Sequence, residues 1–388
     1  MVSPTLSPSV PAPAAPDRPR VLRRPLGFPV GDGAPGPVAV VVGDGLDATR
    51  TAEVVQRLGA AGVLVRTGEA TGLPRPATDG ACEDVEVPSG GSGRVLGALV
   101  AGLADVLAGH RPSAVLVHGG GTAALAGALA ANAAGLHLVH LGAGLRSHDR
   151  RQPEEHHRRV VDGLADLCCA PSAAAVAALR AEGVADERIL LTGDPVVESL
   201  HRLLPDDATQ DALAAELRLP AGYVLLTVDR PDHTGQPELL AQLLGEVATL
   251  VEAGLPVVVP AGPSTADRWR ELGFGGLLDR CTVLGSLDPV QRTVVQHRAA
   301  VLVSDAEGAA EEASVLKRPA LLVRRATERP EVLGTFTTLV PGGLRLAAAV
   351  RRALADDPAR LQTLPSPYGD GSASRVVVES VVKLVAPF

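Results

Sequence analysis

The chain has 388 residues, of which 46% are hydrophobic and 2% aromatic, and its formal net charge is −8 at neutral pH. This length suffices for two domains, each with its own core. The acidic balance argues against a nucleic-acid partner, which would select a basic face. No apolar run approaches the roughly 20 residues that cross a membrane, so we also expect no membrane partner and a cytoplasmic location.

The four cysteines show none of the spacings that hold a metal ion. Cys168 and Cys169 fall in an apolar run, which favours reduced, structural thiols over disulfides. Residues 1–37 contain ten prolines and lack an apolar segment. That composition predicts a disordered Pro-rich tail rather than a signal peptide.

Beyond the tail, short aliphatic runs alternate with helical patterns. Runs of this kind are typical of buried parallel strands, and their alternation with helices predicts α/β domains with doubly wound parallel sheets. The expected strands are residues 38–42, 63–65, 85–87, 115–117, 138–141, 167–169 and 189–191, followed by 224–227, 257–259, 281–283, 300–303, 320–323 and 339–340. The main expected helices are 94–108, 122–134, 238–253, 290–296, 309–315 and 345–355.

The two strand series predict two Rossmann-like domains that face each other across a cleft, where pockets commonly form. We expect an N-terminal domain at 38–203, a polar linker at 204–209 and a C-terminal, nucleotide-binding-type domain at 210–370. Residues 371–388 should form a closing helix that packs back across the hinge.

Residues 115–159 concentrate the candidate chemistry. They read as a strand, the turn Gly119-Gly120-Gly121, a helix, a second strand, a glycine-bearing loop and a helix opened by Pro153. Such a unit places backbone N–H groups, an arginine and carboxylates at the carboxyl ends of parallel strands, where open α/β sheets bind ligands. The nearby His156 and His157 point to different sides of a helix, so we favour a charged helix surface over a metal site.

Several separated motifs resemble the non-hydrolysing UDP-N-acetylglucosamine 2-epimerases. They are Ala143-Gly144-Leu145-Arg146, Pro153-Glu154-Glu155-His156-His157-Arg158, Gly308 with Glu311-Glu312, and Thr327-Glu328-Arg329-Pro330-Glu331. The resemblance covers roughly residues 38–352 and implies the glycosyltransferase-B fold and a dimer. It also implies a UDP-sugar ligand and elimination of UDP followed by its addition back, without a metal or redox cofactor.

The resemblance implies Glu154 as an acid/base residue and Asp229, which stands where the family has a histidine, as a second catalytic candidate. It further implies that the substrate is bound by Arg146, Arg158, Arg230, Gly308, Glu311 and Glu312.

This sequence departs from the family at four of the expected site positions. Gly120 and Gly142 stand where the family has Asp and Glu, while Ala306 and Glu307 replace a Ser and a Gly of the diphosphate cradle. A carboxylate is stabilised at a helix N-terminus for the same reason as a phosphate. We therefore expect Glu307 to occupy or repel the phosphate position. Arg50 is near enough to stand in for the family's diphosphate-binding arginine, but we favour a position on the surface.

Three functions remain open at this point. The first is a divergent epimerase with some UDP-sugar activity, although the departures make ordinary C2 epimerisation doubtful. The second is a non-catalytic pseudo-epimerase that forms a homodimer, or a heteromer with an active paralogue that it regulates. The third is an enzyme repurposed for a related small molecule, such as one that transfers a sugar.

Overall fold

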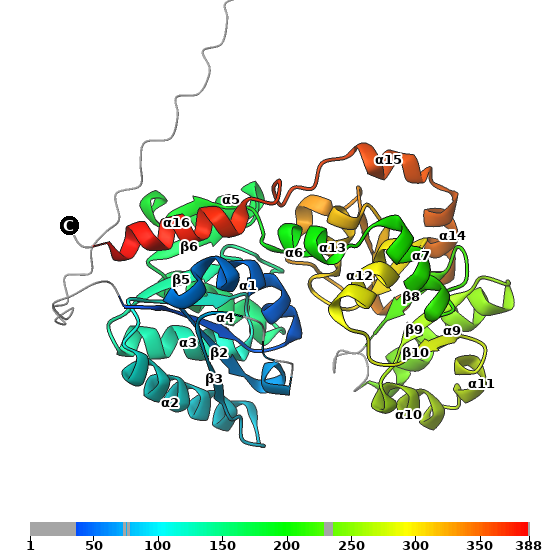
Figure 1. Ribbon diagram of the computed structural model, residues 1–388. Helices are drawn as coiled ribbons and strands as arrows, with labels where there is room; N and C mark the ends of the chain where they lie inside the picture. Colours follow the sequence, from blue (N-terminus) through cyan, green and yellow to red (C-terminus); the bar gives the residue numbers. More distant parts are fainter. Residues whose placement is uncertain (1–35, 73–74, 76–77, 229–235, 387–388) are drawn as a thin grey trace, which may run out of the picture.

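The computed structural model describes residues 36–386 except 73–74, 76–77 and 229–235. The expected Pro-rich tail, residues 1–37, lies outside the described residues apart from its last two positions. The described residues form two α/β domains, shown in blue to green and in green to orange in Figure 1.

The N-terminal domain is built on a seven-stranded parallel sheet of order β3-β2-β1-β4-β5-β6-β7. Its strands are β1 (Val38–Val42), β2 (Gly62–Thr67), β3 (Ala81–Val85), β4 (Ala114–His118), β5 (His137–Leu141), β6 (Leu167–Ala170) and β7 (Ile189–Leu191). The helices that follow them are α1 (Gly45–Leu58), α2 (Ser92–His110), α3 (Thr122–Ala133), α4 (Pro153–Leu164), α5 (Ala173–Ala181) and α6 (Val196–Leu203). Short 3-10 turns lie at η1 (Gly59–Ala61), η2 (Gly68–Gly72) and η3 (Asp186–Arg188).

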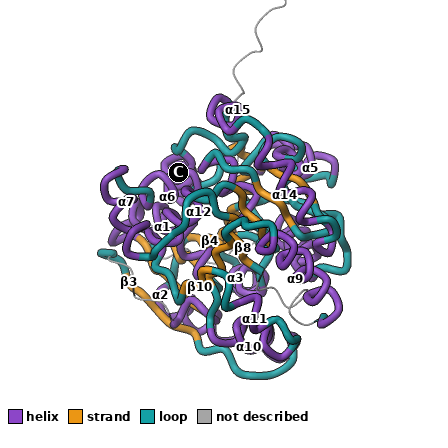
Figure 2. Tube along the Cα trace, turned by 90° about the vertical axis from the view of Figure 1, so that its right-hand side faces the viewer, coloured by secondary structure: helices purple, strands orange, loops and turns teal. Residues whose placement is uncertain are grey.

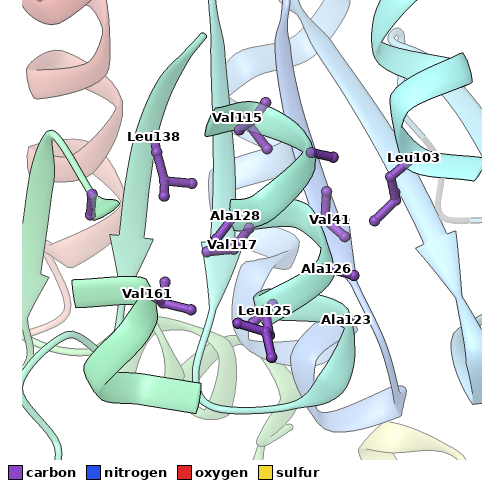
Figure 3. Packing of buried hydrophobic residues seen from close by; sticks show 14 of the residues in the cluster. Val41, Leu103, Val115, Val117, Ala123, Leu125, Ala126, Ala128, Leu138 and Val161 are labelled. Carbon is purple, nitrogen blue, oxygen red and sulfur yellow. The ribbon is translucent and has the colours of Figure 1, made fainter. Parts of the chain in front are cut away.

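Successive side chains of each strand point to opposite faces of this sheet. Ala39 and Val41 of β1 join one core with α2 to α5, whereas Val40 joins a second core with α1 and the C-terminal helix. Figure 3 shows the first core, in which small residues of α3 lie directly against Val117 and Val41. A Cβ on Gly127 would lie 2.9 Å from Val117 Cγ1, so glycine lets helix and sheet approach closely. Both faces are therefore covered by helices, as the sequence predicts.

By length and composition alone, α2 is the single described helix that could cross a membrane. It contributes Leu99, Leu103 and Leu107 to the first core of the N-terminal domain. In this fold it serves as a covering helix of the sheet.

The C-terminal domain carries a six-stranded parallel sheet of order β10-β9-β8-β11-β12-β13. Its strands are β8 (Val224–Thr227), β9 (Val257–Pro260), β10 (Thr282–Leu284), β11 (Val301–Ser304), β12 (Ala320–Leu322) and β13 (Thr337–Leu339). Its helices are α7 (Asp207–Glu216), α9 (Pro237–Glu252), α10 (Pro263–Glu271), α11 (Gly275–Leu278), α12 (Pro289–Arg298), α13 (Ala309–Leu316), α14 (Leu346–Ala355) and α15 (Pro358–Thr363), with 3-10 turns η4 (Pro330–Val332) and η5 (Pro341–Gly343). Figure 2 shows strands in the interior of the molecule and helices around them. The predicted fold class is confirmed.

The last helix, α16 (Ala373–Val385), returns to the N-terminal domain, where Val377, Val381 and Leu384 enter the second core (Figure 1). The chain passes between the two domains twice, once near Asp194 and again near Tyr368. The two segments are side by side, and the Asp194 N–H donates to the carbonyl of Tyr368 at 2.9 Å. The two crossings are thereby tied together at the hinge.

Some predicted element bounds differ from the structure. The third strand, expected at 85–87, is β3 at Ala81–Val85, because its position is set by pairing with β2 rather than by its apolar residues. Strand 339–340 is β13 at Thr337–Leu339, which pairs with β12. Residues 204–209 include the start of α7, whose N-cap Asp206 accepts the Thr209 N–H at 2.8 Å.

Candidate functional site

A pocket of about 460 Å³ lies at the carboxyl ends of the central strands of the C-terminal domain. This is where parallel sheets bind ligands, and the volume is within the usual range for a small molecule. Strand ends contribute Thr227, Pro260 and Ser304, and the start of α13 contributes Ala306, Gly308, Ala309 and Glu312. Gln296 of α12 donates to Glu312 Oε2 at 2.7 Å, which orients that carboxylate at the wall of the pocket.

Glu311, on the first turn of α13, is fully buried between two arginines. Arg329 donates to its Oε2, and Nη2 of Arg50, from α1 of the other domain, lies 2.5 Å from its Oε1. Burial raises the pKa of Glu311 to about 7, although Arg329 and Arg50 oppose that shift. The acid thus holds its proton more strongly than an exposed glutamate does.

Arg50 is 6% exposed, so the expectation of a surface arginine is wrong. The burial of Arg50 could not be predicted from the local sequence, because the other domain covers its side chain and its own helix does not. A Cβ at Gly308 would lie 1.6 Å from Arg50 Nη2. A side chain at residue 308 would therefore displace the Arg50 guanidinium from its place against this backbone.

Glu307 precedes α13 and faces the N-terminal domain. Its carboxylate lies 3.4 Å from Arg158 Nη1 of α4 and 3.7 Å from Arg324 Nη2. Arg324 also donates to Gln152 Oε1 at 3.1 Å, and Arg329 donates to the main-chain carbonyl of Glu307 at 3.3 Å. Arginines of both domains thus meet at this carboxylate.

Gly120 has a steric role next to Arg158. A Cβ at this position would lie 2.7 Å from the carbonyl oxygen of Glu154, 2.9 Å from Arg158 Cγ and 3.0 Å from Arg158 Nη1. The guanidinium of Arg158 therefore fills the space that an aspartate at residue 120 would need. The backbone at Gly142 has a φ of 75°, a left-handed conformation that favours glycine.

The predicted acid/base residue Glu154 lies half-buried on the first turn of α4, against the Gly120 turn. Its neighbour Glu155 is fully buried and accepts hydrogen bonds from Ser147 and Arg159. We expected this helix to present a charged surface, but at Glu155 it faces the interior. His157 bonds to the Gly120 carbonyl at 2.9 Å, which ties α4 to that turn.

Arg146, expected to bind substrate, lies in a network within the N-terminal domain. It donates to Glu182, to the carbonyl of Leu145 and to Asp162, the last at 2.6 Å. Asp162 also bonds to Nδ1 of the buried His140 at 2.6 Å, and its pKa is lowered, because His140 and Arg146 outweigh the effect of burial. Three nitrogens of Arg146 are therefore already bonded to protein.

The N-terminal domain also contains a carboxylate–imidazole pair that no local sequence motif indicates. His118 at the end of β4 bonds through Nδ1 to Asp47 Oδ1 at 2.7 Å. Asp47 is on α1, one turn before Arg50, and also accepts the Gly43 N–H. The spacing of 71 residues conceals this pair from any local motif.

The structure thus brings Arg158, Gly308, Glu311 and Glu312 together around the start of α13 and keeps Arg146 within its own domain. The remaining two expected residues, Asp229 and Arg230, lie outside the described residues. Within the described ranges, no group of His, Cys, Asp and Glu side chains is arranged to hold a metal ion.

A protein-family model described as UDP-N-acetylglucosamine 2-epimerase matches residues 77–382, which is most of the chain. The chain belongs to the UDP-N-acetylglucosamine 2-epimerase family. The Salmonella typhimurium UDP-N-acetylglucosamine 2-epimerase is 30% identical over 300 residues, covering 73% of this chain and 79% of the relative. A Pseudomonas aeruginosa UDP-2,3-diacetamido-2,3-dideoxy-D-glucuronate 2-epimerase is 27% identical over 320 residues, covering 81% of this chain and 86% of the relative.

Solved structures agree on the fold of this epimerase-family chain. The Methanocaldococcus jannaschii UDP-GlcNAc 2-epimerase, solved with UDP-GlcNAc and UDP, matches with a TM-score of 0.78 at 23% identity over 89% of this chain and 99% of that one. A Staphylococcus aureus protein solved with UDP matches with a TM-score of 0.79 at 24% identity over 90% of this chain and 96% of that one. The epimerase-family fold positions the start of α13 and its pocket opposite the Gly120 turn.

Proposed function

We propose that this chain binds the uridine part of a nucleotide or nucleotide sugar in the pocket of its C-terminal domain and has lost ordinary C2 epimerisation. The observation that carries the binding half is the 460 Å³ pocket that runs from the ends of β8, β9 and β11 to the start of α13. Several relatives bear UDP-sugar names, and two of the solved neighbours contain UDP.

The proposed loss of C2 epimerisation rests on the side chains around the Gly120 turn. Inversion at C2 of a sugar requires a group that removes a proton from that carbon and a group that returns one. Gly120 and Gly142 carry no side chain that could do either. The space beside Gly120 is filled by Arg158, so a water molecule is not expected to replace the missing carboxylate. Of the acid/base groups that the family resemblance implies, only Glu154 is retained unchanged, and removal of several groups that act as a unit abolishes most of an enzyme's rate.

Calorimetric titration with uridine and with UDP-N-acetylglucosamine tests the binding half. We expect heat from uridine binding and a loss of roughly tenfold or more in affinity for Glu312→Ala, because Glu312 is a buried wall of the pocket held by Gln296. A matched control is Glu379→Ala, which removes an exposed carboxylate on α16 that pairs with Arg375. Absence of uridine binding at millimolar concentration would contradict the proposal and direct attention to a protein partner.

A second candidate function, another reaction on a nucleotide sugar such as sugar transfer, is favoured by the His118–Asp47 pair. An imidazole that is oriented by a carboxylate is a common arrangement for a general base. His118→Gln and Asp47→Asn should both abolish such a reaction while leaving uridine affinity unchanged. A reaction that survives both changes would rule out this use of the pair.

A further inference from the structure

We propose that Glu307 is a built-in anion at the phosphate end of the pocket, so that the pocket prefers a uridine-type ligand with at most one phosphate to a nucleoside diphosphate. This inference rests on the proposed function, because it concerns which uridine ligand the same pocket takes.

Glu307 lies next to the pocket. Its neighbours Ala306, Gly308 and Ala309 line the pocket, whereas its own side chain lies toward the N-terminal domain beside Arg158. A ligand that fills the pocket and extends past the start of α13 toward Arg158 would therefore come next to Glu307.

Glu307 takes the interactions that a phosphate would need. Helix N-termini and arginines are the usual partners of phosphate groups. Here the carboxylate precedes α13 and lies between Arg158, 1% exposed, and Arg324, 4% exposed. A diphosphate in this place would have to displace the carboxylate from its arginines or lie beside a like charge in a partly buried cleft, and both are unfavourable.

The arginines around the start of α13 retain donors for one small anionic or polar group. Arg50 Nε, Arg158 Nε and Arg158 Nη2 are buried and form no hydrogen bond within the described part of the chain. Buried N–H groups of charged side chains are rarely left without an acceptor. A single phosphate, or the 5′-hydroxyl of a nucleoside with a water molecule, could supply acceptors without displacing Glu307.

Gly120 is part of the same arrangement. Because an added Cβ at residue 120 would lie 2.9 Å from Arg158 Cγ, the side chain of Arg158 can take its path to Glu307 only beside a glycine. The missing carboxylate at residue 120 and the added carboxylate at residue 307 are therefore parts of one arrangement, in which Arg158 takes its acidic partner from the other domain.

The test is a calorimetric series with uridine, UMP and UDP on the wild-type protein and on Glu307→Gln, which keeps the shape and removes the charge. We expect wild type to bind uridine or UMP more tightly than UDP. In Glu307→Gln, UDP affinity should rise by at least roughly tenfold, while uridine affinity should change by no more than roughly twofold. Glu379→Gln on α16 is the control for the change in net charge and should alter none of the three affinities.

Tighter binding of UDP than of uridine and UMP by wild type, or unchanged UDP affinity in a folded Glu307→Gln protein, would overturn the inference and leave the proposed function intact. The wild-type series gives this answer even if the variant is unstable. Binding of none of the three ligands to either protein would overturn the proposed function itself, and the inference with it.

Discussion

Two networks of buried charges lie in this molecule, and they differ in how completely their groups are bonded. In the network within the N-terminal domain, both oxygens of Asp162, both ring nitrogens of His140 and all three nitrogens of Arg146 have partners. In the network across the cleft, Arg50 and Arg158 retain N–H groups without a hydrogen bond in the described part of the chain.

This difference in bonding distinguishes a network with a structural role from a network that can bind a ligand. A fully bonded network holds the loop around Gly144 in one conformation and leaves nothing for a ligand. An incompletely bonded network between domains can be completed by a ligand, and its charges can move with the domains. We therefore assign Arg146 a structural role and expect ligand contacts from Arg50 and Arg158.

The largest expected effect comes from breaking the complete network with Asp162→Asn. Removal of one partner from a buried ion pair costs about 3–5 kcal/mol, because the remaining charges lose their partner. Asp162 is 1% exposed and bonds to His140 and Arg146. Hydrogen exchange of the β5 and β6 amides should report this loss.

Asp186→Asn is the matched control, since Asp186 pairs with Arg180 on the surface, where ion pairs contribute about 0–1 kcal/mol. Equal effects of the two substitutions would show that the N-terminal network does not hold its domain together.

The cleft network should respond to pH through Glu311. Burial raises its pKa to about 7 from an ordinary 4.5, so the folded state keeps a proton that the unfolded state releases between those values. The resulting stability is complete below about pH 4.5 and is lost as pH rises through 7; it amounts to about 3 kcal/mol at most.

We expect Glu311→Gln to flatten this dependence, because glutamine does not titrate. Urea unfolding of both proteins at about pH 5 and about pH 8 measures the difference. Parallel pH profiles for wild type and variant would contradict the role assigned to Glu311.

A smaller effect is expected from Gly120→Ala. The added methyl group would lie 2.7 Å from the Glu154 carbonyl and 2.9 Å from Arg158 Cγ, so the Arg158 side chain must shift. Overpacking of this kind costs about 1–3 kcal/mol. Thermal unfolding measures the loss.

Gly163→Ala on α4 is the control, because nothing lies within 4 Å of a Cβ at that position. Alanine in a helix stabilises it relative to glycine by up to about 1 kcal/mol. If both variants gained stability, the steric account of Gly120 would be wrong.

The sequence predicted the fold class well, because buried parallel strands such as 38–42 and 224–227 are continuous aliphatic runs. It misplaced β3 and β13, which have a neighbour on one side only and are positioned by that pairing. The family resemblance also pointed to Glu311 and Glu312, and the structure places both on the first turn of α13; their roles in binding stay predictions.

Contacts between the domains could not be predicted from local pattern. Arg50 has the appearance of a helix-surface residue until Glu311 of the other domain covers it, and Arg324 becomes part of the site only through Gln152 and Glu307. Residues 229–235, which include the expected Asp229 and Arg230, lie outside the described residues, and their roles stay predictions.

The most direct test of the account is whether this protein exchanges the C2 proton of UDP-N-acetylglucosamine with solvent. Incubation in deuterated water, followed by NMR of the sugar, detects exchange even when no product accumulates. With the Salmonella typhimurium relative as the positive control, we predict that the C2 proton signal persists at the rate of the protein-free sample. Loss of that signal with this protein, together with formation of the C2 epimer, would contradict the loss of epimerisation.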